Sequence, residues 1–438
     1  MSSRKCFKVR AGQGLNGALR VPGDKSISHR SLMLGSMAQG KTRVRGLLMG
    51  EDVLATLGAM RSCGADIQLH DDRVTINGRG AGGLSDPAQA LDLGNSGTGM
   101  RLLSGMLAGL GISATLTGDD SLRSRPMTRI LLPLQAMGAD ISGHDGRPPL
   151  VLRGGRKLHG IDYELPVASA QVKSCVLLAG LNAEGVTRVV EPIRTRDHTE
   201  NMLRSFGCDI RRDQDTWILQ GGSRLQGCEL DVPGDFSSSA FFLLAGSVVP
   251  DSEIRLDHVG MNELRTGLLR IFEAMGADIS ILDHRIVGGE PVADLEVRTA
   301  GLRGIEIPPE WVPDAIDEFP AVFVAAALAE GETVIRGAEE LRVKESDRIS
   351  VMLNGLRQLG ARVEERPDGA VIQGRRRLDG GVVDAEDDHR CAMSLAVAGL
   401  CCSEPVVVKS VDNVATSFPG FEAAMARLGG NIEVVDAG

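Results

Sequence analysis

The amino-acid sequence predicts an α/β repeat fold of two lobes, each built from three β-α-β-α-β-β units in which the first helix is buried. Three observations lead to this prediction: a repeated helix end, a repeated helix start, and a β-branched strand between them. The 438 residues, of which 42% are hydrophobic, are enough for two or three domains. Six units in one core would exceed the usual domain size, so we expect two groups of three.

The repeated helix end is a short phrase that occurs six times, for example at 134–141. In each copy an apolar-periodic helix runs into a glycine, and a strand begins directly afterwards. Glycine adopts the left-handed conformation that closes a helix at little cost. The phrase recurs about every seventy residues, too long for a common solenoid, so each unit must hold several elements. The six glycines are Gly64, Gly138, Gly207, Gly276, Gly360 and Gly429.

The repeated helix start is a turn of small residues followed by an almost uninterrupted apolar stretch. A helix that is apolar on all sides is a buried one. The six turns lie at 22–30, 94–101, 168–173, 233–239, 317–320 and 387–390. Between each buried helix and its glycine-capped neighbour we expect a β-branched strand, at 42–44, 114–116, 186–190, 253–256, 333–335 and 406–408. Further strands should follow the capped helix, as at 73–76 and 217–219.

The boundary between the lobes is marked by a phrase that the chain uses twice. Val-Pro-Gly-Asp occurs at 21–24 and again at 232–235. Residues 1–20, with a strand at 7–9, precede the first copy. Two arrangements remain open from these residues alone: the segment packs on the N-terminal lobe, or it belongs to the C-terminal lobe and the chain crosses over twice.

The overall composition limits the partners. The formal net charge of -10 argues against a nucleic-acid groove. No apolar run approaches the roughly 20 residues that span a bilayer, and the start lacks the apolar core of a signal peptide. The eight scattered cysteines indicate reduced thiols. We therefore expect a cytoplasmic protein that binds neither nucleic acid nor membrane.

The helix starts carry cations, which is unusual because a helix N-terminus already attracts anions. Lysine or arginine there is unfavourable unless an anion binds between the cation and the helix end. The cleft between the lobes is therefore predicted to bind anions. The alternative remains open that the small residues merely cap helices. The basic residues, all expected within the first two helical turns, are Lys25, Arg30, Arg101, Lys173, Arg196, Lys344, Arg348 and Arg390.

Two carboxylates at such helix starts are candidates for acid–base chemistry. Asp317 opens a helix that should be fully buried, where it can be an N-cap. Glu345 lies three residues before Arg348, where it can belong to a salt-bridged helix start. Together they could divide the acid and base roles of a proton transfer. Neither G-x-x-x-x-G-K-[ST] nor a G-x-G-x-x-G after a strand occurs, so no nucleotide site is indicated.

At these residues the chain resembles the enolpyruvylshikimate-phosphate synthase family, from about residue 8 to residue 429. The matching phrases lie at 21–30, 93–98, 125–127, 169–171, 317–318, 342–348, 388–390 and 416–419. The family's fold has two lobes of three β-α-β-α-β-β units joined by two crossovers, in agreement with the repeats. The resemblance implies a C-terminal lobe of residues 1–20 plus 235–438, an N-terminal lobe of residues 21–234, and an active site in the interlobe cleft.

The resemblance implies transfer of an enolpyruvyl group from phosphoenolpyruvate to the 5-hydroxyl of shikimate 3-phosphate, with release of phosphate. Asp317 would take the hydroxyl proton, and Glu345 with Lys25 would protonate the methylene carbon, giving a tetrahedral intermediate. No metal or organic cofactor is needed, and we expect a monomer. By position, shikimate 3-phosphate would be held by Lys25, Ser26, Arg30, Ser169, Ala170, Gln171, Arg196, Asp317 and Lys344. Phosphoenolpyruvate would be held by Lys25, Gly97, Arg125, Gln171, Arg348 and Arg390.

The sequence departs from the best-known family pattern at several positions. Ala170 stands where many members have a second serine, and Thr416 where many have a lysine. The stretch 194–199 lacks a tyrosine common there. These traits look like the subgroup associated with glyphosate tolerance, although Gly97 stands where strongly tolerant members carry alanine.

Two rival functions are weighed against this one. The related UDP-N-acetylglucosamine enolpyruvyl transferase usually has a reactive cysteine on the loop corresponding to 117–127, and this loop has none. A non-catalytic anion-binding repeat protein is the other rival. The negative net charge and the pairing of Asp317 with Glu345 argue against it.

Overall fold

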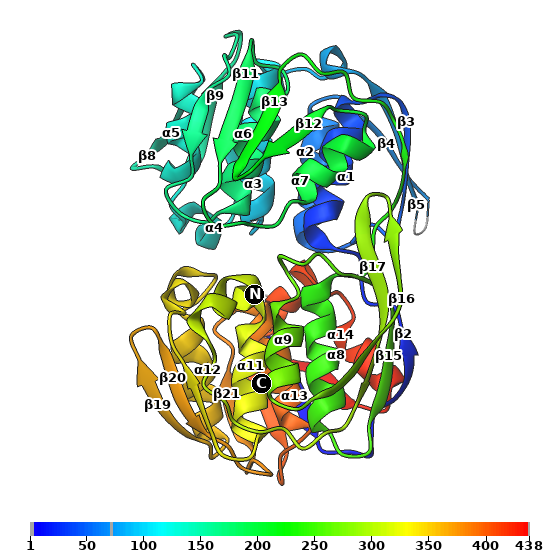
Figure 1. The fold of residues 1–438 in the computed structure, drawn as a ribbon, viewed down its shortest axis with the longest axis vertical. Coiled ribbons are helices and arrows are strands. Elements are labelled where there is room, and N and C mark those ends of the chain that lie inside the picture. The colour runs from blue at the N-terminus through cyan, green and yellow to red at the C-terminus, as the bar shows by residue number, and fades with distance from the viewer. Residues whose placement is uncertain (1–3, 71–72, 437–438) are drawn as a thin grey trace. The chain divides into compact units, whose positions relative to one another are not determined.

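The computed structural model describes residues 4–70 and 73–436, and the chain divides into two compact units (Figure 1). Unit 1 consists of Met1–Pro22, Gly234–Arg285 and Pro291–Gly438, and unit 2 of Gly23–Pro233 with Ile286–Glu290. The last segment had been expected in the C-terminal lobe. It groups with unit 2 because Ser205 donates to the Gly288 carbonyl at 2.9 Å and Glu290 lies 3.1 Å from His198.

The predicted repeat is confirmed, and it forms one small sheet in each copy. In the second repeat the strand order is β6-β7-β9-β8. The first pair is parallel and the other two pairs are antiparallel. A parallel pair needs a crossover connection, and the buried helix of the repeat provides it.

Unit 2 holds three repeats. The first comprises α1 (Lys25–Met37), β3 (Gln39–Arg45), α2 (Glu51–Ser62), β4 (Asp66–His70), β5 (Arg73–Arg79) and β14 (Glu229–Asp231). The second comprises β6 (Leu91–Asp92), α3 (Gly97–Leu110), β7 (Ala114–Thr117), α4 (Asp120–Ser124), α5 (Thr128–Ala136), β8 (Asp140–His144) and β9 (Arg147–Arg153). The third comprises β10 (Asp162–Glu164), α6 (Ala170–Gly180), β11 (Val186–Val190), α7 (His198–Ser205), β12 (Ile210–Asp213) and β13 (Thr216–Gln220).

Unit 1 holds the other three. The fourth comprises β2 (Asn16–Leu19), α8 (Phe236–Val248), β15 (Glu253–Gly260), α9 (Gly267–Ala274), β16 (Asp278–Val287) and β17 (Glu290–Arg298). The fifth comprises α10 (Val312–Ala315), α11 (Phe319–Leu328), β18 (Glu332–Ile335), α12 (Arg348–Gln358), β19 (Arg362–Arg366) and β20 (Gly369–Gln373). The sixth comprises β21 (Gly381–Asp384), α13 (His389–Gly399), β22 (Val406–Lys409), α14 (Phe421–Arg427), β23 (Asn431–Asp436) and β1 (Lys5–Arg10).

Strands far away in the sequence complete three of the sheets. Strand β14 pairs with β3 in the first repeat, and β2 pairs with β15 in the fourth, both in parallel. Strand β1 lies between β22 and β23, where Phe7 is opposite both Val408 and Val434. Strand β1, from the N-terminal part of the chain, thus completes a sheet whose other strands come from the C-terminal part.

The six repeated glycines end helices as predicted. Their φ angles lie between +82° and +99°, in the left-handed region. In every copy the N–H after the glycine bonds to the carbonyl five residues earlier, at 2.9 to 3.0 Å, as from Ala139 to Leu134. This is the hydrogen-bonding pattern of a Schellman cap.

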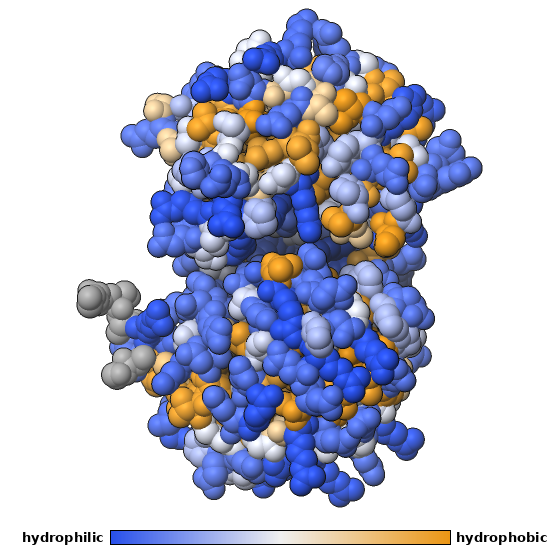
Figure 2. Space-filling view, turned by 90° about the vertical axis from the view of Figure 1, so that its left-hand side faces the viewer, coloured by the Kyte–Doolittle hydropathy of each residue, from blue (hydrophilic) through white to orange (hydrophobic). Residues whose placement is uncertain are grey.

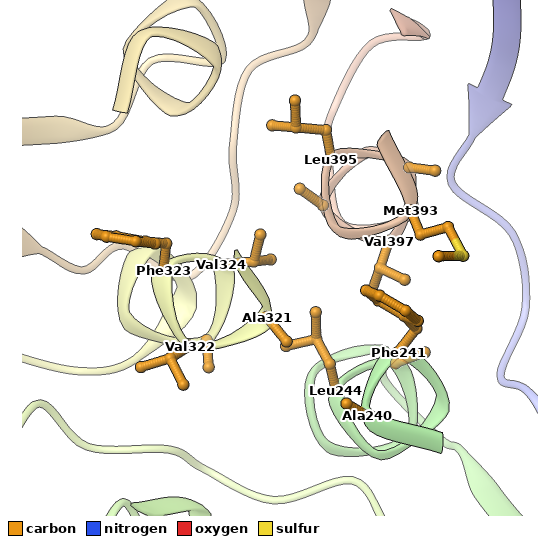
Figure 3. Packing of buried hydrophobic residues seen from close by; sticks show 14 of the residues in the cluster. Ala240, Phe241, Leu244, Ala321, Val322, Phe323, Val324, Met393, Leu395 and Val397 are labelled. Atoms are coloured by element: carbon orange, nitrogen blue, oxygen red, sulfur yellow. The ribbon is translucent and has the colours of Figure 1, made fainter. Parts of the chain in front are cut away.

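The first helix of each repeat is buried. In unit 1, α8, α11 and α13 pack together, and Figure 3 shows side chains of α8 pointing toward the other two helices. In unit 2, α3 and α6 approach so closely that a Cβ on Gly105 would lie 2.1 Å from the Cys175 carbonyl oxygen. On the face seen in Figure 2, hydrophilic residues dominate, with apolar residues in separate patches. The packing of each trio brings its helix starts together.

Candidate functional site

In unit 2 the starts of α1, α3 and α6 converge. Arg101 of α3 donates to the Gln171 side chain of α6 at 2.7 Å, and Gln171 donates to Thr98 of α3 at 3.0 Å. The N-cap side chains are Asp24, Ser96 and Ser169, each accepting a backbone N–H from the first turn. The small residues therefore cap helices, and the cations are present as well, so the two interpretations of these turns do not exclude each other.

Arg30 is the most firmly held cation of this group. Its guanidinium donates to the Ser26 carbonyl at 2.8 Å, to Thr199 at 2.6 Å and to Ser174 at 2.8 Å. Burial lowers the pKa of Arg30 to about 10, which still leaves the side chain charged at neutral pH. Beside it at the helix start, Lys25 lies 3.1 Å from the Asp52 carboxylate.

The start of α3 faces two guanidinium groups. Arg125 donates to the Asn95 side chain at 2.5 Å and to Ser121 at 3.2 Å. A Cβ on Gly97 would lie 2.9 Å from Nη1 of Arg101 and 3.2 Å from Nη1 of Arg125. The glycine therefore gives both arginines access to the helix N-terminus, where an anion would bind.

Two cations of unit 2 differ from the predicted anion site. Lys173 lies within the first two turns of α6, as predicted, but its side chain is fully buried and lies 2.7 Å from Glu191 and 3.0 Å from Glu200. Arg196 is not in a helix, because α7 begins only at His198 and the residue lies in the loop before it. Ser169 and Ala170 are placed as expected, at the N-cap and first position of α6.

In unit 1 the second cluster forms around Arg348, the first residue of α12. Its Nε donates to Asp388 at 2.8 Å and its Nη2 to Glu345 at 2.6 Å, while its Nη1 lies 3.7 Å from Asp317. Burial opposes its charge, but these carboxylates prevail and raise the pKa of Arg348. Burial likewise opposes the charge of Asp388, and Arg348 lowers the pKa of that carboxyl. Among the described residues, no hydrogen-bond acceptor meets the buried Nη1 of Arg348.

Asp317 is not the N-cap of a buried helix, which corrects one predicted role. It lies in a 3₁₀ turn, Ile316–Glu318, and α11 starts after Glu318 without a side-chain cap. Its carboxylate lies instead 3.8 Å from Lys344, besides its contact with Arg348. The predicted position of Lys344 within a helix is also wrong, because Lys344 precedes α12, which begins at Arg348.

Arg390 and Thr416 complete unit 1. Arg390, the second residue of α13, donates to the Asp317 carbonyl at 3.0 Å and lies 3.4 Å from the Glu318 carboxylate. Thr416 is buried in a 3₁₀ turn and donates to the Asn413 carbonyl at 2.7 Å. Thr416 therefore stabilises its own turn and contributes no positive charge.

Several residues that hold the predicted site residues were not foreseen. Asn95 and Asp388 stand inside the helix-opening turns, so their position in the repeat could have pointed to them. Thr199 and Ser174 carry no such signal, since they meet Arg30 only through the packing of α1, α6 and α7.

Within residues 4–70 and 73–436, histidine, cysteine, aspartate and glutamate side chains do not gather in threes as a metal site would require. No helix in that part of the chain is long and apolar enough to cross a bilayer.

Comparison with known proteins agrees with this arrangement. A family model described as EPSP synthase (3-phosphoshikimate 1-carboxyvinyltransferase) matches residues 9–425. The chain is 56% identical over 434 residues to the 3-phosphoshikimate 1-carboxyvinyltransferase of Alkalilimnicola ehrlichii, covering 98% of this chain and 97% of that one. It is 56% identical over 432 residues to that of Acidithiobacillus ferrooxidans, covering 98% and 99%. An EPSP synthase structure from Acinetobacter baumannii superposes with a TM-score of 0.90 at 49% identity, covering 98% of this chain and 100% of that one.

Proposed function

The chain belongs to the EPSP synthase family, and we propose that it transfers the enolpyruvyl group of phosphoenolpyruvate to shikimate 3-phosphate, releasing phosphate. The acceptor is the 5-hydroxyl, and the product is used in aromatic amino acid biosynthesis. The two rival functions lack comparable support. Both substrates are anions with several charges, which suits helix starts that carry lysine and arginine.

One observation supports this function most directly. Arg348 is buried and three carboxylates lie beside its guanidinium, but Nη1, 3.7 Å from Asp317, makes no hydrogen bond to any described residue. A buried donor of this kind requires an explanation. An anionic substrate such as phosphoenolpyruvate would supply the missing acceptor.

The proposed binding residues are those that the family resemblance implies. Shikimate 3-phosphate would be held by Lys25, Ser26, Arg30, Ser169, Ala170, Gln171, Arg196, Asp317 and Lys344. Phosphoenolpyruvate would be held by Lys25, Gly97, Arg125, Gln171, Arg348 and Arg390. The contacts of Arg30 and Arg125 support their roles, since fixed acceptors on neighbouring elements orient each guanidinium.

The proposed chemistry consists of two proton transfers and the loss of phosphate. Asp317 takes the proton of the 5-hydroxyl group. The hydroxyl oxygen at the same time bonds to the central carbon of phosphoenolpyruvate. Glu345, assisted by Lys25, gives a proton to the methylene carbon, which becomes the methyl group of a tetrahedral intermediate. That methyl group then loses a proton and the C–O bond to phosphate breaks, so the enolpyruvyl double bond forms again. Carboxylates held beside arginine and lysine are suited to such acid–base work.

We also propose that the protein is a cytoplasmic monomer whose partners are these two small anions, with no nucleic acid and no membrane among them. The negative net charge supports the first of these exclusions. Size-exclusion chromatography with light scattering tests the monomer: a mass near twice that of the chain would contradict it.

The decisive experiment measures phosphate release from phosphoenolpyruvate with shikimate 3-phosphate, with UDP-N-acetylglucosamine, or with neither. We expect release only with shikimate 3-phosphate. A Glu345→Gln variant should lose this activity. A Glu364→Gln variant, which changes an exposed carboxylate in the same unit, serves as the matched control and should keep it. Release with UDP-N-acetylglucosamine alone, or no release at all, would refute the proposed function.

A further inference from the structure

A fully buried lysine in unit 2 has no part in the chemistry proposed above. Lys173 is the fourth residue of α6, and its ammonium lies 2.7 Å from Glu191, 3.0 Å from Glu200 and 3.1 Å from the Thr195 carbonyl oxygen. Burying an ammonium group is costly unless acceptors surround it. Its three partners all belong to one segment, residues 191–200.

Glu191 holds the start of this segment. It follows β11, and its carboxylate accepts the Thr195 N–H at 2.8 Å and the Trp217 indole N–H at 3.2 Å. It also accepts the Thr195 hydroxyl. Arg196 directly follows Thr195 in the chain. The Glu191 carboxylate and the Lys173 ammonium, which both bind Thr195, therefore fix the backbone next to Arg196.

The end of the segment is held in the same way. Glu200, in the first turn of α7, contacts the same ammonium group, and its neighbour Thr199 accepts a hydrogen bond from Arg30 at 2.6 Å. Burial raises the pKa of Glu200, although Lys173 acts in the opposite direction. Both ends of the loop 191–197 are therefore fastened to Lys173, while Pro192, Ile193 and Arg194 between them are exposed.

We propose that Lys173 is a positioning residue for shikimate 3-phosphate. Its ammonium fixes the loop 191–197 so that the guanidinium of Arg196 is already in place when this substrate arrives. The inference rests on the proposed function, because that function gives Arg196 its ligand. Pre-organising a binding group in this way raises affinity by reducing the cost of ordering it.

A purely structural role for Lys173 predicts a different result. Loss of a structural ion pair would lower stability and the fraction of active protein, and it would not single out one substrate. A positioning role predicts weaker binding of shikimate 3-phosphate, whereas phosphoenolpyruvate should be affected little, because Arg125 at the start of α3 is held by separate partners.

The test uses the full chain and three variants. Lys173→Met removes the ammonium. Thr195→Val removes the hydroxyl that donates to Glu191 and keeps the ammonium of Lys173 beside Glu191 and Glu200. Lys157→Met is the matched control, since Lys157 forms an exposed pair with Glu184 at 3.1 Å in the same unit. Calorimetry measures binding of shikimate 3-phosphate without phosphoenolpyruvate, and steady-state kinetics gives the KM of phosphoenolpyruvate at saturating shikimate 3-phosphate.

We expect Lys173→Met to weaken shikimate 3-phosphate binding about 10-fold or more, the scale of one charge-assisted hydrogen bond. Thr195→Val should weaken it less, about 3-fold, because one hydrogen bond is lost while the ammonium of Lys173 stays in place. In both, the KM of phosphoenolpyruvate should stay within about 2-fold, and Lys157→Met should change neither quantity.

Each outcome decides between the possibilities. Unchanged shikimate 3-phosphate affinity in folded Lys173→Met, or an equal rise for both substrates, overturns the inference. If Lys173→Met does not fold, Thr195→Val decides: unchanged affinity there overturns it as well. A wild type that binds no shikimate 3-phosphate overturns the proposed function itself, and this inference with it.

Discussion

Adding one methyl group at Gly97 tests how closely the start of α3 is built around its two arginines. The new Cβ would lie 2.9 Å from Nη1 of Arg101 and 3.2 Å from Nη1 of Arg125. The glycine is the first residue of a helix and has no positive φ, so alanine brings no backbone strain. Within the protein, the added methyl group of Gly97→Ala therefore acts on the guanidinium groups of Arg101 and Arg125.

The size of the effect follows from these two distances. Reaching an ordinary contact of 3.4 Å requires a shift of about 0.5 Å at one nitrogen and about 0.2 Å at the other. Hydrogen bonds to Gln171 and Asn95 resist these shifts. Overpacking costs about 1–3 kcal/mol, and flexible side-chain ends favour the lower value, so the KM of phosphoenolpyruvate should rise about 5-fold.

Glyphosate is a longer molecule, so Gly97→Ala should weaken the binding of glyphosate more than the binding of phosphoenolpyruvate. The family resemblance implies that glyphosate needs space beside this glycine, so its inhibition constant should rise roughly 5- to 150-fold, from the same 1–3 kcal/mol. The assay measures both constants in wild type and Gly97→Ala. Gly58→Ala in α2 is the matched control, since a Cβ there would meet nothing within 4 Å.

Three results would refute this reasoning. If Gly97→Ala changes neither constant, the two guanidinium groups move without consequence and the contact argument is wrong. If both constants rise by the same factor, the methyl group does not distinguish the ligands by length. If Gly58→Ala has the same effect, the change is not specific to the start of α3.

The remaining predictions concern catalysis, substrate affinity and pH. Glu345→Gln and Asp317→Ala should each lower steady-state turnover about 10²-fold or more while shikimate 3-phosphate still binds; near-normal turnover would remove that residue from the mechanism. Ala170→Ser restores a hydroxyl at the start of α6 and should tighten shikimate 3-phosphate binding about 2- to 12-fold by calorimetry; equal affinity would show that the hydroxyl makes no contact. Burial lowers the pKa of His29 from its ordinary 6.5 to about 3, so the unfolded chain takes up a proton that the folded chain excludes. Stability should therefore fall as pH drops from 6.5 toward 3, by up to about 1.4 kcal/mol per pH unit, and denaturant unfolding of His29→Gln should lack this contribution. Parallel pH profiles for wild type and variant would contradict the assignment.

The repeat architecture could be predicted from the sequence because its signals are local. A glycine after an apolar-periodic helix specifies a left-handed cap wherever it occurs, and all six such glycines have that conformation. A stretch that is apolar on all sides can only be stable when buried, as α11 is. The six helix ends and the buried helices could therefore be predicted without knowing which segments meet, whereas strands β14 and β2 join their sheets only through tertiary pairing.

The role of each charged residue was decided by tertiary structure. Arg30 and Lys173 both lie near a helix start, and the sequence treated them alike. In the folded chain Arg30 is fixed by hydroxyls and a carbonyl, whereas Lys173 is buried beside the carboxyl groups of Glu191 and Glu200. Asp317 was expected to cap a helix, but a 3₁₀ turn directs its carboxylate toward Lys344 and Arg348.

The physical reason for this division is the range of the forces involved. Backbone conformation depends on neighbours within a few residues, so the sequence by itself determined the repeats and their caps. Coulombic and hydrogen-bond partners are selected by distance in space, and Thr199 reaches Arg30 across a separation of 169 residues. Only the packing of α1, α6 and α7 brings these groups together. The tertiary structure therefore decided that Thr199 and Ser174 hold Arg30, whereas Lys173 is buried beside Glu191 and Glu200.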